Sequence, residues 1–345
     1  MLQALFHAWE RRLSDVTKDR VVRPFEWGLD WIPDHHERDA VPADAIAGYV
    51  SSVMADTDAF FTPPPTTDYT LTPAADGDLL TFPSAFVTPH ESNNTVRCRY
   101  FRPKESPARP RAAVLVMPQW NSDAGGHVGL CKLLAWNGMS ALRLSLPYHD
   151  QRMPPELHRA DYIVSANVMR TLQVCRQAVL DARRAIAWLK AQGYERIGIL
   201  GTSLGSCLAL LTAAHEPLVD AEALNHISPY FADVVWRGLS TRHVREGLNG
   251  HVELELLRSI WQPISPRGYL ERLRNRKTLL VYARYDLTFP VDLSEDLVRA
   301  FKDLGIPHEV AVLRCGHYST GKAPFKFVDG YILTRFLKRA LVQGF

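Results

Sequence analysis

The sequence has few cysteines, little excess charge and no long hydrophobic run. Its 345 residues contain five cysteines without Cys-x-x-Cys spacing, which argues against both a disulfide framework and a zinc site. They are expected to be buried thiols in a reducing compartment: Cys98, Cys131, Cys175, Cys207 and Cys315. The net charge is only +3 and the basic residues are scattered, so nucleic acid is not an expected partner.

The sequence also lacks targeting and membrane-spanning signals. No apolar run approaches the length of a membrane span, and the charges near the N-terminus come too early for a secretory signal. We therefore expect a cytoplasmic protein. Residues 1–20 carry apolar side chains near the helical period and predict an amphipathic helix packed against the body. The alternative is contact with a membrane surface through Arg11, Arg12 and Lys18.

One tract invites a metal interpretation. Residues 34–39 read Asp-His-His-Glu-Arg-Asp, but adjacent histidines do not easily converge on one ion, and no further ligand spacing accompanies them. We therefore expect neither a metal nor an organic cofactor.

The most informative segment runs from Arg196 to Ala214 and has the pattern of a nucleophile elbow. Ser203 lies between Gly201 and Gly205, where a short β-favouring run meets a run of apolar helix formers. A turn this tight strains the serine backbone and needs neighbours without side chains two positions away on each side. The backbone N–H of Leu204 would then point at a developing oxyanion, with a helix dipole behind it.

Partners for this serine follow in the order acid, then histidine. Asp286 ends a predicted buried strand that starts at Thr278, and His317 follows the predicted strand Glu309 to Arg314. Ligands bind beyond the carboxyl ends of strands in open α/β sheets, so these positions suit a Ser-Asp-His triad. The rival candidates are less well placed: His308 precedes its strand, His251 lies in a helical segment, and Asp292 and Asp296 suit a helix cap and a surface.

Predicted strands and helices alternate along most of the chain, which indicates an α/β fold with a mainly parallel, doubly wound sheet. We expect an N-terminal extension, residues 1–78, that is helical and ends in a proline-rich connector. A catalytic domain, residues 79–345, follows. The expected strands are 79–87, 95–101, 113–117, 140–145, 197–200, 222–227, 278–286 and 309–314, and the longer expected helices are 129–137, 167–192, 207–214 and 293–304. Residues 230–273 predict a helical cap inserted near Ser203.

The segments around Ser203, Asp286 and His317, with the strand Ala113 to Met117, resemble the α/β-hydrolase superfamily over residues 79–345. Residues 147–152, Pro-Tyr-His-Asp-Gln-Arg, with a helix beginning near Asn167, look like the dienelactone-hydrolase-like esterase branch. More remotely, the chain is similar to the family of alpha/beta-hydrolase-domain-containing protein 18. Dienelactone hydrolases proper use a cysteine nucleophile where this elbow has serine.

The resemblance implies a second oxyanion donor just after the strand 113–117. Trp120 aligns with the usual donor position, and its backbone N–H is the expected donor, with that of Gln119 as the alternative. Gln119 is also a candidate for contact with substrate.

Further substrate-binding candidates lie in the loop after residue 147 and in the insert. Arg152 has the geometry to bind a carboxylate or phosphate, and His149 lies on the same loop. The alternative for Arg152 is an ion pair with Asp150 or Asp161. Trp236 belongs to an apolar, partly aromatic insert that favours an uncharged or acyl-type substrate.

These observations predict a serine hydrolase that cleaves a carboxylic ester of a small molecule by an acyl-enzyme mechanism. Two alternatives remain at this point. The chain would be a peripheral membrane lipid hydrolase if its first helix contacts lipid, or a catalytically silent binding protein if the triad is retained without activity.

Overall fold

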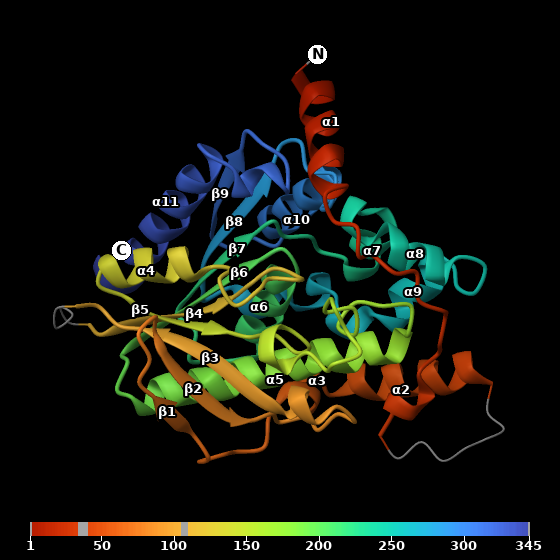
Figure 1. Ribbon diagram of the computed structural model, residues 1–345, viewed down its shortest axis with the longest axis horizontal. Helices are drawn as coiled ribbons and strands as arrows, with labels where there is room; N and C mark the ends of the chain where they lie inside the picture. Colours follow the sequence, from red (N-terminus) through yellow and green to blue (C-terminus); the bar gives the residue numbers. More distant parts are fainter. Residues whose placement is uncertain (1, 34–40, 105–109, 344–345) are drawn as a thin grey trace.

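A nine-stranded sheet organises the molecule in the computed structural model, which describes residues 2–33, 41–104 and 110–343 (Figure 1). The sheet order is β1-β2-β3-β5-β4-β6-β7-β8-β9. Strands β1, β2, β3 and β5 pair antiparallel, whereas β5 and all later neighbours pair parallel. The strands are β1 (Thr70–Thr72), β2 (Asp78–Pro83), β3 (Thr95–Phe101), β4 (Ala112–Met117), β5 (Ser140–Leu144), β6 (Arg196–Thr202), β7 (Ala221–Asn225), β8 (Lys277–Ala283) and β9 (His308–Leu313).

Helices cover both faces of this sheet, and every residue of its strands β4, β5 and β7 is buried. Strands covered on two sides read as continuous apolar runs, as these do. Helices α4 and α11 pack on one face, and α5, α6 and the segment after β7 pack on the other. The helices are α1 (Leu2–Ser14), α2 (Pro42–Ala55), α3 (Thr57–Phe61), α4 (Val128–Trp136), α5 (Val168–Ala191), α6 (Leu204–His215), α7 (Phe231–Arg237), α8 (Arg242–Leu248), α9 (Leu254–Ile260), α10 (Val291–Asp303) and α11 (Phe325–Lys338).

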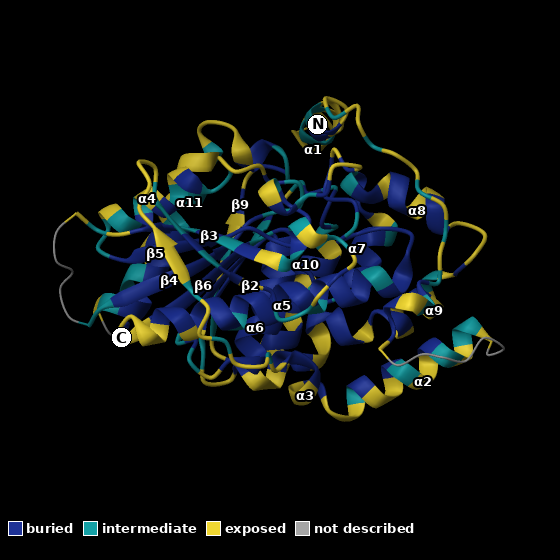
Figure 2. Cartoon of the chain, turned by 60° about the horizontal axis from the view of Figure 1, so that its bottom comes forward, coloured by how far each residue is buried: buried dark blue, intermediate teal, exposed yellow. Residues whose placement is uncertain are grey.

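Helix α5 is the longest helix among the described residues and most of it is buried (Figure 2). It begins where the Asn167 side chain accepts the backbone N–H of Arg170, a typical N-cap. Helix α6 is buried throughout. These two helices therefore form the rigid layer on which the carboxyl end of β6 rests.

The α/β class and the mainly parallel sheet are as predicted. The strand expected over 79–87 ends at Pro83, because the chain then turns and the N–H of Ser84 bonds the carbonyl of Asn94. The structure adds the short strand β1, whose three exposed residues give no periodic signal. All five cysteines are buried and unpaired.

Residues before β2 share the core of the sheet. Ile46 of α2 and Phe61 of α3 are fully buried in the same hydrophobic cluster as α5 and α6. In the segment after β7, helices α7, α8 and α9 and the 3₁₀ turns up to Leu273 are linked to that cluster by Trp261, which is fully buried. Among the described helices, none is both long and apolar enough to cross a membrane.

Candidate active site

Ser203 sits in a strained turn between β6 and α6. Its backbone angles are φ 57° and ψ −122°, a conformation that L-residues rarely adopt. A Cβ on Gly201 would lie 2.1 Å from the carbonyl oxygen of Gly205, and a Cβ on Gly205 would lie 2.2 Å from that of Met117. Both positions therefore require glycine, and the turn holds the Ser203 side chain at the edge of the sheet.

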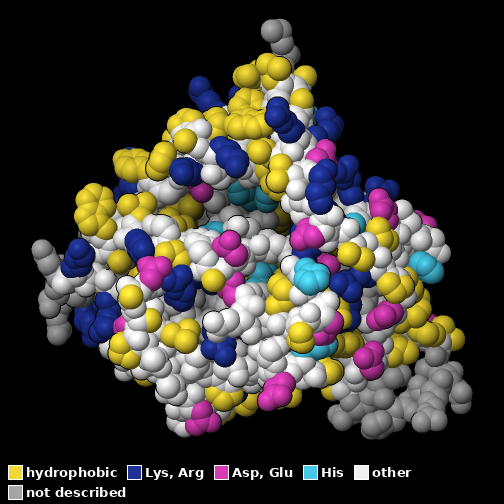
Figure 3. Space-filling view, viewed as in Figure 1, with side chains coloured by type: hydrophobic (Ala, Val, Ile, Leu, Met, Phe, Trp, Pro, Cys, Tyr) yellow, Lys and Arg dark blue, Asp and Glu magenta, His cyan; other side chains and the backbone are white. Residues whose placement is uncertain are grey.

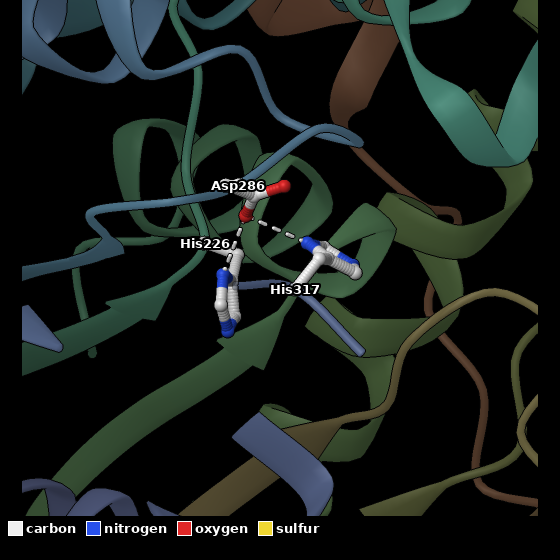
Figure 4. Close-up of side chains that lie close together, drawn as sticks. All are labelled: His226, Asp286 and His317. Atoms are coloured by element: carbon white, nitrogen blue, oxygen red, sulfur yellow. Dashed lines mark hydrogen bonds and ion pairs between the residues drawn. The ribbon is translucent and has the colours of Figure 1, made fainter. Parts of the chain in front are cut away.

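The structure brings Ser203, Asp286 and His317 together. His317 Nε2 lies 3.0 Å from Ser203 Oγ, and His317 Nδ1 lies 2.9 Å from Asp286 Oδ2 (Figure 4). The imidazole of His317 stacks on Phe289 with ring centroids 5.3 Å apart and an interplanar angle of 7°. This geometry suits an imidazole that takes a proton from Ser203 while the carboxylate fixes its orientation.

Asp286 is buried and engaged at both oxygens. Oδ1 accepts the backbone N–H groups of Thr288 and Phe289, both at 2.8 Å. Burial by itself would raise the pKa of Asp286, but the charge of His317 and the hydrogen bonds from two imidazoles hold it well below its usual range. The carboxylate is therefore ionised at neutral pH.

The second imidazole on Asp286 belongs to His226, which directly follows β7. His226 Nδ1 lies 2.9 Å from Asp286 Oδ2, the same oxygen that faces His317, and the two rings are 4.5 Å apart. His226 has a positive φ of 56° and is 2% exposed. The sequence analysis missed this residue, although its place at the carboxyl end of a parallel strand carries the same signal as Ser203, Asp286 and His317.

Burial would lower the pKa of His317, but the neighbouring Asp286 raises it by charge and by hydrogen bonding, and Glu10 adds to this, so the pKa lies above its ordinary value. Glu10 comes from α1 and is fully buried. Its Oε2 accepts the N–H of Tyr318 at 2.8 Å and its Oε1 that of Ser319 at 2.9 Å. Helix α1 thereby holds the loop that carries His317.

Two backbone segments adjoin the nucleophile as expected for an oxyanion hole. Leu204 is the first residue of α6, and the first N–H groups of a helix have no partner within it. Trp120 follows β4, whose end lies against Gly205. The Trp120 indole donates to the carbonyl of Ala160 at 2.8 Å and its ring stacks on His243, which fixes this turn.

Three expected substrate contacts are corrected by the structure, since His149, Arg152 and Trp236 are not among the described residues that line the cavity at Ser203. Arg152 is fully buried and pairs with Asp181 at 2.8 Å, and its other N–H groups reach backbone carbonyls. This ion pair is neither of the two expected ones, because Asp150 pairs with Arg143, and Asp161 with Arg159 and Arg23.

His149 and Trp236 have structural roles instead. His149 Nε2 accepts the backbone N–H of Asn121, so the ring braces the turn after β4. Trp236 lies under the guanidinium of Arg245, 5.1 Å from its ring centre. Gln119, by contrast, lines the cavity.

The rival acid and histidine residues lie apart from Ser203. Asp292 is exposed and pairs with Arg237 at 2.8 Å. Asp296 lies on α10 and is also away from the cavity lining. His308 begins β9 at the opposite end of the strand from His317, and His251 stacks on Phe25.

His226, Asp286 and His317 also form a compact group of potential metal ligands. In this arrangement Asp286 Oδ2 already accepts from the Nδ1 atoms of both imidazoles, so the group is organised as a hydrogen-bonded cluster. Residues 34–39, the other segment weighed as a metal site, lie outside the described residues except where Pro33 precedes them.

Ser203 opens on a cavity of about 1410 Å³. Figure 3 shows the face of the molecule hollowed below α1, with histidine side chains inside the hollow. The insert contributes Phe231, Val234 and Val235 to the lining, and the N-terminal segment contributes Thr17 and Arg20. A cavity of this size accommodates a small-molecule ligand of ordinary dimensions.

Comparison with known proteins supports this fold. A family model described as alpha/beta hydrolase domain containing 18 matches residues 81–237, a segment that includes Ser203 but ends before Asp286 and His317. No curated protein matches the sequence.

Among solved structures, the acetyl xylan esterase of Paenibacillus sp. R4 is similar with a TM-score of 0.60 and 17% identity, covering 96% of this chain and 99% of that one. Acetyl xylan esterase 1 of Thermoanaerobacterium sp. JW/SL YS485 has a TM-score of 0.57 and 13% identity, covering 94% and 98%.

An acylaminoacyl peptidase of Pyrococcus horikoshii has a TM-score of 0.59 and 16% identity over 86% of this chain. The match spans only 44% of the length of that peptidase. Together with the sheet order and the elbow, these likenesses show that the chain has the α/β-hydrolase fold and is a member of the α/β-hydrolase superfamily.

Proposed function

We propose that this protein is a serine hydrolase that cleaves a carboxylic ester of a small molecule. The observation that carries the proposal is the continuous hydrogen-bonded chain from Ser203 Oγ through His317 to Asp286, with contacts of 3.0 and 2.9 Å. Nucleophile, base and orienting acid within hydrogen-bond reach are the signature of nucleophilic catalysis. The similarity to esterase structures is consistent with this activity.

In the proposed mechanism, His317 accepts the proton of Ser203 as the hydroxyl oxygen attacks the ester carbonyl carbon. Asp286 stabilises the imidazolium that forms. The N–H groups of Leu204 and Trp120 hold the tetrahedral oxyanion, each donor contributing about 3 kcal/mol when typical. His317 then protonates the leaving alcohol, and water releases the acyl group from Ser203 by the same steps.

The proposal also assigns the parts of the chain. Residues 79–345 form the catalytic domain, with residues 230–273 as a cap over the acyl group, and residues 1–78 form an N-terminal extension. The apolar cap residues Phe231, Val234 and Val235 line the cavity, which suits an acyl chain. No metal ion or organic cofactor takes part in any step.

The test is hydrolysis of p-nitrophenyl esters from acetate upward by the wild type and by Ser203→Ala. We expect the variant to lose at least about 1000-fold in kcat, because the nucleophile is gone. Ser259→Ala is the matched control, since Ser259 is an exposed serine on α9 that bonds only its own helix at the Leu256 carbonyl. Equal rates in wild type and Ser203→Ala would rule out this mechanism and favour a binding protein.

A further inference from the structure

The cavity at Ser203 has two arms of different chemistry. One arm is apolar and belongs to the core cluster under the insert; its lining includes Val164, Cys207, Phe231, Val234, Val235 and Phe289. The other arm lies toward α4 and α11 and is lined by His127, Thr202, Asn225, His226, Asp329 and Thr334. An ester bound at Ser203 extends into both arms, because its acyl and alcohol parts leave the carbonyl carbon in different directions.

The polar arm begins directly beside the nucleophile. The N–H of Ser203 bonds the carbonyl of Asn225 at 2.8 Å, and Thr202 is paired with Asn225 across β6 and β7. His127 Nε2 lies 2.9 Å from Thr202 Oγ1, and Asn225 Nδ2 donates to Asp329 Oδ2 at 2.9 Å. These contacts join residues from α4, β6, β7 and α11 into one wall.

Several polar atoms of this wall are buried without a hydrogen-bond partner among the described residues. They are His127 Nδ1, Asn225 Oδ1, His226 Nε2, Asp329 Oδ1 and Thr334 Oγ1. The side chains of Asn225, His226 and Thr334 belong to residues only 1%, 2% and 4% exposed. Buried polar groups in native proteins are nearly always satisfied, so five such atoms on one wall of one cavity indicate a polar ligand.

The chemistry of these atoms favours a ligand that donates hydrogen bonds. His226 points its Nδ1 at Asp286, so its Nε2 carries the lone pair when the ring is neutral. Asn225 and Asp329 present oxygens, and burial raises the pKa of Asp329 to about 6, which leaves it mostly ionised at neutral pH. Hydroxyl groups fit such acceptors, and Thr334 both donates and accepts.

An ammonium group is the other donor-rich possibility, but the surroundings disfavour it. Lys326, Arg335 and Lys338 line the same cavity and would repel a second cation. A neutral hydroxylated group meets the acceptors without that repulsion.

We propose that the polar arm is a subsite for the alcohol half of the substrate and that this alcohol is a polyol, such as glycerol or a sugar. The inference rests on the proposed ester hydrolysis, because it assigns the two halves of the ester to the two arms. The acyl group lies under the insert, and the hydroxyl groups of the alcohol donate to Asn225, His226 and Asp329.

The kinetic test compares two esters with the same acyl group, glycerol monobutyrate and propyl butyrate, which differ only in two hydroxyl groups. The readout is the ratio of their kcat/KM values. We expect the wild type to prefer the glycerol ester. Thr334→Val, which keeps the shape of the side chain, should lower the ratio about fivefold, the effect of one hydrogen bond between neutral groups.

Asp329→Asn should lower the ratio by about tenfold or more, because hydrogen bonds to charged groups are stronger. The substitution keeps an oxygen to accept the Asn225 amide, so the wall retains its internal contact. Asp303→Asn is the matched control, since Asp303 is exposed at the end of α10, and its ratio should equal that of the wild type. A wild-type ratio near one, or a preference that survives both variants, overturns the proposal.

A binding measurement separates this inference from the proposed function. Calorimetric titration of Ser203→Ala with the same two esters needs no turnover. We expect tighter binding of glycerol monobutyrate, with the difference lost in Ser203→Ala combined with Asp329→Asn. If no ester is hydrolysed but this preference is present, the hydrolase proposal fails and the subsite stands; equal affinities for the two esters overturn the subsite.

Discussion

A single carboxylate oxygen, Oδ2 of Asp286, faces the Nδ1 atoms of both His226 and His317 at 2.9 Å. His226 has no contact with Ser203 and so acts, in this account, as a positioning residue for Asp286. Its hydrogen bond draws on the same negative charge that raises the pKa of His317. The position of the acid limb of the reaction therefore depends on both imidazoles.

We predict that kcat/KM falls as pH decreases through the pKa of His317, since only the neutral imidazole accepts a proton from Ser203. Because the pKa of His317 is raised, this limb lies above pH 6.5. In His226→Ala, Asp286 has one donor fewer and interacts more strongly with His317. The pKa of His317 then rises further, and the limb moves up by about half a pH unit.

Two further variants check this interpretation in pH–rate profiles. Asn at position 226 tolerates a positive φ and places an N–H near the site of Nδ1, so His226→Asn should keep the wild-type limb. His251→Ala removes an exposed histidine from the segment after β7 and should also leave the limb unchanged. A limb that stays in place or moves to lower pH in His226→Ala would contradict the positioning role.

Sequence reasoning at the residue scale worked where one local rule was enough. Gly201, Ser203 and Gly205 are set by the sterics of a tight turn, and Asp286 and His317 follow from chain order and strand ends. His226 obeys the same strand-end rule but was missed, because one histidine already completed the expected triad. Arg152 and His149 were misassigned because the loop after β5 turns inward, where Asp181 and the Asn121 backbone satisfy them.

At the scale of elements, helix α1 is the least expected part of the site. Its apolar period predicted a helix packed on the body, yet the decisive contact is polar. Glu10 is fully buried and accepts two N–H groups from the loop after His317, and a Cβ on Gly316 would lie 2.3 Å from its carboxyl carbon. No local pattern reveals this contact, because its partners lie some 300 residues away in the sequence.

Glu10→Gln should weaken catalysis and move the acid limb of kcat/KM to lower pH. Glutamine keeps one acceptor oxygen but leaves one buried N–H without a partner, at a cost of about 1–3 kcal/mol in stability. It also removes a negative charge that raises the pKa of His317. The measurements are a pH–rate profile and a thermal unfolding curve.

Glu246→Gln is the matched control for this prediction, because Glu246 is an exposed carboxylate on α8. It should match the wild type in both measurements. An acid limb that stays in place in Glu10→Gln, or that moves to higher pH, would show that α1 does not influence His317.

On the scale of the whole molecule, alternating strand and helix patterns were enough to predict the mainly parallel sheet, since buried parallel strands are continuous apolar runs. The same patterns did not reveal how residues before β2 join the core. Ile46 and Phe61 are fully buried beside α5 and α6, and β1 extends the sheet edge. Such packing depends on contacts between distant segments, which periodicity within one segment does not encode.

The division of the cavity into an apolar and a polar arm is also a property of the assembled molecule. The apolar arm was anticipated from the hydrophobic insert after β7. The polar arm combines side chains from α4, β6 and α11 with the strand end at β7, and only the folded sheet brings Thr202, Asn225 and Asp329 together.

The most direct test of the central claim, that Ser203 is an activated nucleophile, is labelling with a fluorophosphonate probe followed by mass spectrometry of the digested protein. We predict a single adduct, on the peptide that carries Ser203, formed at least about 100-fold more slowly in His317→Ala because the base is missing. An adduct on another residue, or equal labelling rates in wild type and His317→Ala, would contradict the account.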